Sequence, residues 1–268
     1  MIKKKIYISN LAWHSKDIKY IIEKIKKYEL SGIDIAPLQL SKNWKDIDKK
    51  IKRYYLDLKA HNIKVNALQG IFYKTNLSLF EDQKNGFKNI LNHIKFIIKL
   101  CKITHCNKII IGSSQFRNPK KMSTKEADLV FYSFLKKIIK YLKKEKIFFC
   151  LEAIPKEYGE KYINDISHLI KIVKKVNSKW IKINFDTSIF HFNRLKTKIF
   201  LENINLIKNI QITEKNFNYL NNISNNNKKF CNIINKIKDI NQISIEIIKK
   251  KTHLPSIDNS FKNIKDLF

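Results

Sequence analysis

Four side chains that carry oxygen end or interrupt apolar segments in the second half of this 268-residue sequence. Glu152 follows Phe-Phe-Cys-Leu, and Asp186 follows Ile-Asn-Phe. Gln211 stands within Ile-Gln-Ile-Thr, and Glu246 stands within Ile-Ser-Ile-Glu-Ile-Ile. A buried carboxylate without a partner costs several kcal/mol or shifts its pKa, so a folded protein normally pairs it or gives it a metal ion. A set of oxygen ligands favours one Mn²⁺ or Mg²⁺ ion over zinc.

Each of these acids, taken alone, has a simpler explanation. Any one of them could cap the helix that follows it or pair with one of the many lysines. The hypothesis of a shared metal site therefore depends on whether the chain brings the ends of these segments to one place.

Eight short apolar segments, rich in β-branched and aromatic residues, are typical of strands that are buried on both faces. They are Lys5–Ser9, Gly32–Ala36, Val65–Gly70, Lys108–Gly112, Ile147–Ala153, Ile181–Asp186, Ile207–Thr213 and Gln242–Ile247. Between them, apolar residues recur three and four positions apart, which predicts amphipathic helices with lysines on their outer faces. Ser15, and Ser123 with Glu126 as a capping box, are the expected N-caps of two of these helices.

Eight strand–helix units without a glycine-rich nucleotide turn predict an α/β fold, a closed (β/α)8 TIM barrel. The chain has only five glycines, which leaves no room for a dinucleotide or P-loop motif. Residues 1–268 are expected to form a single domain. In such barrels the chemistry lies at the carboxyl ends of the strands. The ends of strands five to eight would then meet at one mouth, which predicts a metal site made of Glu152, Asp186, Gln211 and Glu246.

The net charge of +31 suggests a nucleic-acid partner, but the composition argues against one. Only Arg53, Arg117 and Arg194 among the 54 basic residues are arginines, whereas base recognition favours the planar guanidinium. The abundant Lys, Asn and Ile indicate codon bias across a solvated surface. The charge should still attract anions such as phosphorylated metabolites.

The cysteines and the hydrophobic pattern predict a cytoplasmic protein. Four cysteines without a CxxC pair exclude a disulfide scaffold and a zinc ribbon. No apolar segment is long enough to span a membrane, and the basic start has too short an apolar stretch for a secretory signal.

Several motifs, in this order and spacing, resemble the sugar phosphate isomerase/epimerase family of xylose-isomerase-like TIM barrels over nearly the whole chain. They are Ser9-Asn10-Leu11-Ala12-Trp13, Gly32-Ile33-Asp34-Ile35-Ala36-Pro37, Gln69-Gly70-Ile71-Phe72-Tyr73, Gly112-Ser113-Ser114 with Arg117, Glu152-Ala153-Ile154-Pro155, Asp186-Thr187 with His191, Gln211-Ile212-Thr213-Glu214 and Ser244-Ile245-Glu246.

The resemblance implies a metal-dependent isomerase or epimerase of carbohydrate metabolism that acts on a sugar or sugar phosphate. One divalent ion would be held by Glu152, Asp186, the strand-seven residue and Glu246. The two glutamates would lie on opposite faces of the substrate as an acid/base pair. This chemistry is coherent, because removal of a proton beside a carbonyl gives an enediolate that a metal stabilises, and a carboxylate on each face can remove or return the proton.

The sequence departs from the family pattern at one ligand. In many relatives the strand-seven ligand is a histidine, whereas Gln211 offers an amide oxygen, which is a weaker ligand. Repair enzymes like endonuclease IV need a histidine-rich trinuclear zinc site. The seven scattered histidines of this chain argue against that branch.

Three further residues are candidates for substrate binding, each with an ordinary alternative. Asn10 ends the first strand and either binds a hydroxyl or closes a turn. Arg117 either clamps a phosphate or carboxylate bidentately or forms a surface ion pair near a helix start. By resemblance His191 contacts a substrate hydroxyl; otherwise it is a loop histidine.

Three other functions remain open from the sequence. A dehydratase or aldolase-type enzyme would use the same metal site and the same enediolate. A non-catalytic sugar-binding barrel would instead have Glu152 and Glu246 held by lysines. A nucleic-acid binder or abasic-site nuclease would need a basic groove at the mouth.

Overall fold

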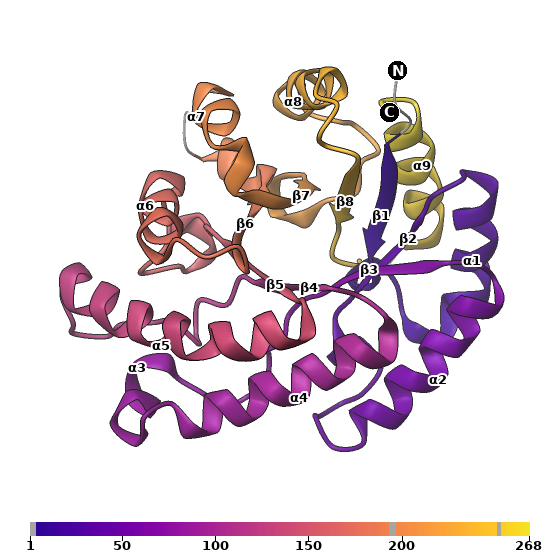
Figure 1. Ribbon diagram of the computed structural model, residues 1–268. Coiled ribbons are helices and arrows are strands. Elements are labelled where there is room, and N and C mark those ends of the chain that lie inside the picture. Colours follow the sequence, from indigo (N-terminus) through magenta and orange to yellow (C-terminus); the bar gives the residue numbers. More distant parts are fainter. Residues whose placement is uncertain (1–3, 193–196, 251–252) are drawn as a thin grey trace.

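The strands of the protein form a closed barrel of eight parallel strands in chain order, in which β8 pairs with β1. The computed structural model describes residues 4–192, 197–250 and 253–268. Figure 1 shows the strands as a central ring. They are β1 (Lys5–Ser9), β2 (Gly32–Ile35), β3 (Lys64–Leu68), β4 (Lys108–Ile111), β5 (Phe148–Glu152), β6 (Ile181–Asp186), β7 (Ile207–Thr213) and β8 (Gln242–Glu246).

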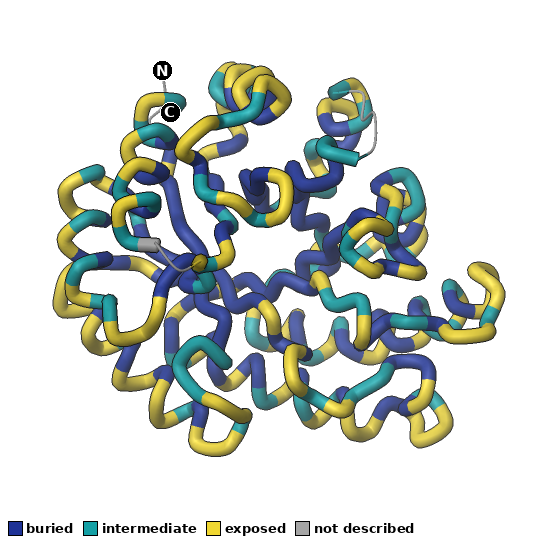
Figure 2. The backbone as a smooth tube through the Cα atoms, turned by 180° about the vertical axis from the view of Figure 1, so that it is seen from behind, coloured by how far each residue is buried: buried dark blue, intermediate teal, exposed yellow. Residues whose placement is uncertain are grey.

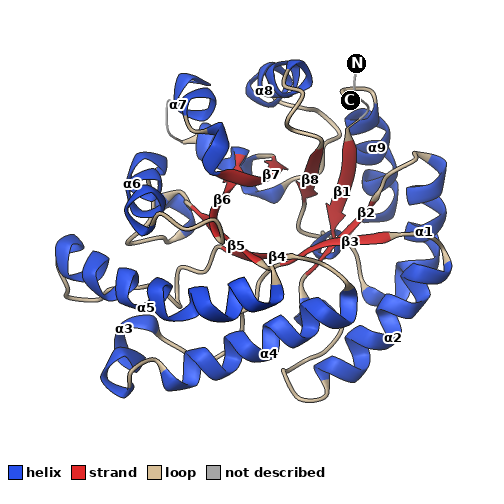
Figure 3. Ribbon diagram, in the orientation of Figure 1, coloured by secondary structure: helices blue, strands red, loops and turns tan. Residues whose placement is uncertain are grey.

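The α-helices form an outer layer around this ring, as the blue ribbons of Figure 3 show. Among the described residues no helix is long and apolar enough to cross a membrane. The helices are α1 (Ile18–Lys27), α2 (Ile47–Ala60), α3 (Leu79–Asp82), α4 (Lys88–Thr104), α5 (Thr124–Glu145), α6 (Ile166–Val176), α7 (Thr197–Glu202), α8 (Asn225–Lys236) and α9 (His253–Lys265).

The predicted barrel is confirmed, with small differences at the strand ends. The bounds of β1, β6 and β7 are those expected, and the other five strands end one or two residues earlier. The reason is that buried apolar residues such as Ala36 and Ala153 continue into the loops of the mouth, so hydrophobicity alone does not show where strand pairing stops.

One of the two predicted helix starts is confirmed. Ser123 caps α5, and a reciprocal bond with Glu126 completes the capping box. Ser15 does not cap α1, which is a correction to the prediction. Residues Ser15–Asp17 form a short 3₁₀ helix instead, and α1 begins after Asp17.

The helices pack their apolar stripes on the barrel and expose their lysines. In α4 the buried residues are three or four positions apart, for example Ile90, Ile94, Ile97 and Cys101. Figure 2 shows the consequence, since the barrel strands are buried and the outer turns of the helices are exposed. Burial of these stripes is the main term that fixes the helices around the barrel.

The interior of the barrel is unusually polar. TIM barrels are normally filled by layers of branched aliphatic side chains. Here the buried strand residues include a lysine, an aspartate and several amides, and they contact one another: Asp34, Asn66, Lys108, Asn184, Asn209, Gln211 and Ser244. These hydrogen bonds connect strands that lie across the barrel from one another.

Candidate active site at the barrel mouth

A cavity of about 570 Å³ lies at the carboxyl ends of the strands. Glu152 ends β5 and Glu246 ends β8, and both line this cavity. Aromatic side chains form part of its wall, namely Tyr73, Tyr158 and Phe217. The cavity therefore combines two acids with rings on which a sugar could stack.

Glu152 is held by one amide and lies close to a glycine. Oε2 of Glu152 accepts a hydrogen bond of 2.9 Å from Nδ2 of Asn184, on the neighbouring strand β6. A Cβ atom on Gly112 would lie 2.7 Å from the same oxygen, so any larger residue at position 112 would displace the carboxylate. Burial raises the pKa of Glu152 to about 8, and the charge of Asp186 adds to the effect.

Glu246 has a matching amide partner on the other side of the mouth. Oε1 of Glu246 accepts a hydrogen bond of 2.8 Å from Nε2 of Gln69, just after β3. The same nitrogen of Gln69 donates to Oγ of Ser9 at 2.8 Å. Burial raises the pKa of Glu246 well above its usual range, followed in importance by the charges of Asp186 and Glu152.

Asp186 ends β6 and is buried, and it does not line the cavity. Its Oδ1 accepts the backbone N–H of Ser188 at 2.7 Å, which caps the short 3₁₀ helix Thr187–His191. Its Oδ2 is buried, and within the described residues it makes no hydrogen bond of normal geometry, although the side chain of Thr213 lies close enough to favour the ionised form. Such an oxygen has only partly replaced its lost water, and a cation is one way to compensate it.

Gln211 is fully buried, and both ends of its amide are engaged. Oε1 of Gln211 accepts a hydrogen bond from Nδ2 of Asn184. Nε2 of Gln211 donates to Oε1 of Gln69 at 3.0 Å. Gln211 therefore contacts neighbouring amides, and it does not line the cavity.

The chemistry of this donor set fits a hard divalent cation, but its side chains do not converge on one. Within the described ranges no three His, Cys, Asp or Glu side chains are grouped so that they could hold a metal ion. Asp186 nevertheless raises the pKa of both glutamates, so the three carboxylates repel one another. A divalent ion would relieve that repulsion, and its binding would require rotation of the side chains.

Asn10 contacts the backbone of the next strand. Its Oδ1 accepts the N–H of Ala36 at 2.7 Å, and its Nδ2 donates to the carbonyl of Ala36 at 3.4 Å. Asn10 therefore joins the end of β1 to the residue after β2, and its role in substrate binding stays a prediction.

Arg117 forms an ion pair, but not the surface pair that the sequence suggested. Both Arg117 and Glu160 have 0% exposed side chains, with 2.7 Å between Nη2 and Oε2. Nε of Arg117 donates to the same oxygen at 2.8 Å. Arg117 does not line the mouth cavity.

His191 lies beside Asp186 rather than in the cavity wall. Its Nε2 is 2.8 Å from the carbonyl oxygen of Thr213 on β7. Burial raises the pKa of Asp186, and a positive charge on His191 would act against this effect. The mouth cavity is lined instead by Lys249, whose Nζ donates to Oε1 of Gln39 at 2.5 Å.

Sequence reasoning missed Gln69 and Asn184 as parts of the site. Gln69 directly follows β3, at the carboxyl end where the mouth residues lie. Asn184 precedes Asp186 by two positions, so both side chains lie on the same face of β6. Period-2 spacing from a candidate ligand was therefore the available signal for Asn184.

The raised pKa of Glu152 predicts how stability depends on pH. The folded protein keeps this proton up to about pH 8, whereas the unfolded chain releases it near pH 4.5. The free energy of unfolding should therefore fall as the pH rises through this window, by at most about 1.4 kcal/mol per pH unit for this group. Urea denaturation of chelator-treated protein across the window would measure the slope. Glu152→Gln should reduce this slope, and part of it should remain because the pKa values of Glu246 and Asp186 are also raised. A wild type that gains stability with pH would contradict this prediction.

Solved structures of sugar epimerases and isomerases share this fold at low identity. The apo 3-keto-D-glucoside 4-epimerase of E. coli has a TM-score of 0.76 and 15% identity, over 98% of this chain and 100% of the other. An L-ribulose 3-epimerase has a TM-score of 0.76 and 13% identity, over 98% and 94%. A sugar phosphate isomerase/epimerase from Parabacteroides distasonis has a TM-score of 0.73 and 12% identity, over 99% and 97%. At such identities the likeness shows the fold alone.

No curated protein matches the sequence. The profile of the xylose isomerase-like TIM barrels matches residues 22–257. This match spans most of the chain and agrees with the closed barrel of eight parallel strands. The chain therefore belongs to the xylose isomerase-like TIM barrel family.

Proposed function

We propose that the protein is a divalent-metal-dependent isomerase or epimerase that acts on a sugar or sugar phosphate. The reaction moves a proton next to a carbonyl through an enediolate, with Glu152 and Glu246 as the acid/base pair. One observation carries the proposal: two glutamates from strands on different sides of the barrel line the same cavity, and both have raised pKa values.

These pKa values suit proton exchange near neutral pH. A general base works best when its pKa is close to the working pH, and Glu152 is at about 8. One carboxylate removes the proton from the substrate carbon, and the other returns it from the opposite face. Asn184 bonds one oxygen of Glu152, and Gln69 bonds one oxygen of Glu246. The other oxygen of each glutamate is available to the substrate.

Glu152, Asp186 and Glu246 would hold the metal ion, with Gln211 as the fourth oxygen donor proposed from the sequence. A divalent cation bound there supplies Lewis-acid stabilisation of negative charge on the substrate. Oδ2 of Asp186, which is buried without a hydrogen bond of normal geometry among the described residues, supports this assignment. Mn²⁺ and Mg²⁺ suit these oxygen donors better than Zn²⁺ does.

The ion pairs of the described residues argue against the alternative of a non-catalytic sugar-binding barrel. It would have Glu152 and Glu246 neutralised by lysines. Neither glutamate forms a salt bridge with a lysine or arginine in the part of the chain that the structure describes. Two buried acids with raised pKa values in one cavity are more consistent with a reactive site.

A substrate screen in D₂O tests the proposed reaction. Purified protein with Mn²⁺ is incubated with neutral ketoses, aldoses and their phosphates, and NMR follows loss of the proton beside the carbonyl. We expect exchange together with an epimer or isomer for at least one class. Loss of water or cleavage of a carbon–carbon bond would indicate the dehydratase or aldolase-type reaction instead. No exchange with any member of the screen would count against the proposal.

Metal binding should stabilise the protein through Asp186. Mn²⁺ at 100 times its dissociation constant should add about 2.7 kcal/mol to the free energy of unfolding, because it binds only the folded state. Asp186→Asn should remove this gain, whereas Glu81→Gln, at an exposed acid paired with Lys120, should keep it. Thermal unfolding with and without Mn²⁺ provides the measurement, and equal gains in all three proteins would contradict the assignment.

A further inference from the structure

A chain of hydrogen bonds runs through the barrel from Lys108 to Glu152. Nζ of Lys108, at the start of β4, donates to Oδ1 of Asn209 at 3.2 Å. Nδ2 of Asn209 donates to Oδ1 of Asn184 at 2.8 Å, and Nδ2 of Asn184 donates to Oε2 of Glu152 at 2.9 Å. Every donor in this chain points from the lysine toward the carboxylate.

The chain has a second branch, which ends at the other glutamate. Nδ2 of Asn184 also donates to Oε1 of Gln211. Nε2 of Gln211 donates to Oε1 of Gln69 at 3.0 Å, and Nε2 of Gln69 donates to Oε1 of Glu246 at 2.8 Å. This branch has the same polarity, so one lysine lies at the start of both chains.

The polarity of the chain is set at its ends. The two ends of an amide group have the same shape, so sterics alone do not choose between its two orientations. A lysine ammonium can only donate, and the oxygens of Glu152 and Glu246 that meet the amides accept, whether or not the other oxygen of the carboxyl group carries a proton. With a donor at one end and acceptors at the other, only one orientation of each intervening amide satisfies every hydrogen bond.

We propose that Lys108 is a positioning residue that orients the amides of Asn209, Asn184 and Gln211, and thereby holds both glutamates in place. This proposal rests on the proposed function of the two glutamates. It also gives Gln211 a role, because its amide transmits the orientation from Asn184 to Gln69.

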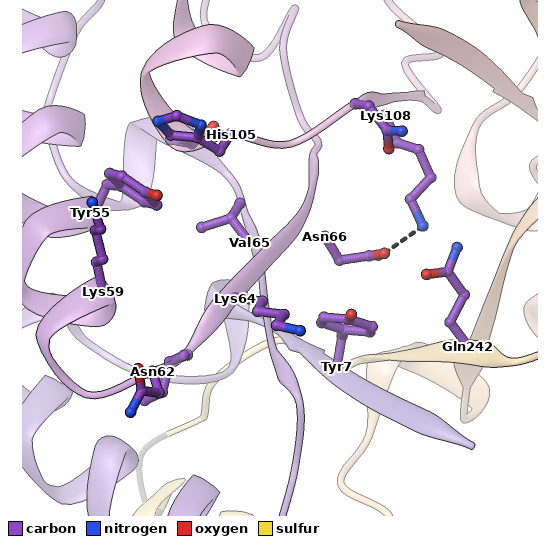
Figure 4. Close-up of a pocket in the computed structure, with 13 residues that line it drawn as sticks. Tyr7, Tyr55, Lys59, Asn62, Lys64, Val65, Asn66, His105, Lys108 and Gln242 are labelled. Atoms are coloured by element: carbon purple, nitrogen blue, oxygen red, sulfur yellow. Dashed lines mark hydrogen bonds between the residues drawn. The ribbon is translucent and has the colours of Figure 1, made fainter. Parts of the chain in front are cut away.

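The surroundings of Lys108 support this role. Its side chain is buried, and Nζ also donates to Oδ1 of Asn66, the contact drawn in Figure 4 beside Tyr7 and Gln242. Nδ2 of Asn66 in turn donates to Oδ1 of buried Asp34 at 2.7 Å and to Oδ1 of Asn209 at 3.2 Å. Lys108 therefore orients Asn209 both directly and through Asn66. Burial lowers the pKa of Lys108 to about 8, and the negative charge of Asp34 acts against this effect, so the ammonium donor is present below about pH 8.

Side-chain amide exchange measures the orientation without metal or substrate. NMR of chelator-treated, ¹⁵N-labelled protein follows the side-chain NH₂ groups of Asn184 and Gln211, identified by their loss in Asn184→Asp and Gln211→Glu. Lys108→Met with Asp34→Asn removes the donor and its buried counter-charge together, so no lone charge remains inside the barrel. We expect both NH₂ groups to exchange at least about tenfold faster in this double variant, while backbone amides of the strands stay protected.

A second variant covers the case in which the double variant does not fold. Asn209→Asp keeps the size and adds attraction to Lys108, but it cannot donate to Asn184, so the same acceleration is expected. Lys182→Met is the matched control, because Lys182 donates to the carbonyl of Asn205 at 2.9 Å and has no place in the chain. Unchanged exchange in Asn209→Asp, or equal acceleration in Lys182→Met, would overturn the proposal. Failure of the proposed function would instead show as wild-type protein without isotope exchange in any sugar.

Discussion

Replacing Glu246 by Gln is expected to lower the rate of sugar epimerisation or isomerisation about 1,000-fold, the usual scale for loss of a general acid or base. Gln keeps the shape of the side chain but cannot take up or return a proton. Glu152→Gln should have an effect of the same size. The measurement is NMR of product formation with the substrate found in the D₂O screen. Each variant should keep its fold, because Gln has the shape of the protonated glutamate that burial and the neighbouring carboxylates favour.

The two variants should differ in which epimer still exchanges its proton, because each glutamate would act on one face of the substrate. If the reaction is an epimerisation, each variant retains one glutamate and so should still exchange the proton of the epimer that presents it to that side. Conversion of one epimer to the other should be lost in both. If both variants keep full conversion, these glutamates are not the acid/base pair.

Arg117→Met is expected to destabilise the protein by about 3–5 kcal/mol, because Glu160 would remain buried and unpaired. The Glu160 carboxylate has fixed partners besides the arginine. Its Oε1 accepts the backbone N–H groups of Tyr162 and Ile163 at 2.9 and 3.3 Å, so it cannot turn to solvent without losing them. Denaturant unfolding gives the free energy, and stability within about 1 kcal/mol of wild type would contradict this account.

A double variant separates the lost charge from the lost packing. Arg117→Met with Glu160→Gln leaves no unpaired charge, and Gln can still accept the two backbone N–H groups. We expect it to recover most of the stability that Arg117→Met loses. A double variant as unstable as the single one would show that the packing of the guanidinium, rather than its charge, accounts for the effect.

The barrel was predictable because its signal is repeated along the chain. Eight apolar segments of strand length alternate with amphipathic helices, and a closed barrel is the arrangement that buries all of them. The predicted start of α1 at Ser15 was wrong because a 3₁₀ turn and an α-helix share the same polar first residues. Which of Ser15 and Asp17 begins the helix depends on local backbone geometry that periodicity does not carry.

The positions of the site residues were predictable, but their partners were not. Glu152 and Glu246 interrupt apolar strands, and strand topology alone places both at the mouth. The hydrogen bond of Gln69 to Glu246 joins residues 177 positions apart. No local pattern indicates such a contact, because it depends on the register of non-neighbouring strands.

Arg117 illustrates the same limit for a charged residue. From its position after Gly112-Ser113-Ser114, the sequence predicted either a substrate clamp or a surface ion pair. In the structure Arg117 forms a buried ion pair with Glu160, 43 positions away, which neither prediction included. Long-range pairing between charged side chains depends on the packing of loops, which composition and spacing do not determine.

The most direct test of the proposed metal-dependent proton transfer is a crystal structure of the protein with Mn²⁺, in which anomalous scattering locates the metal. The account predicts one Mn²⁺ at the barrel mouth with oxygens of Glu152, Asp186 and Glu246 bound to it. Mn²⁺ bound elsewhere, or a mouth that stays free of metal while the two glutamates keep their amide partners, would contradict it.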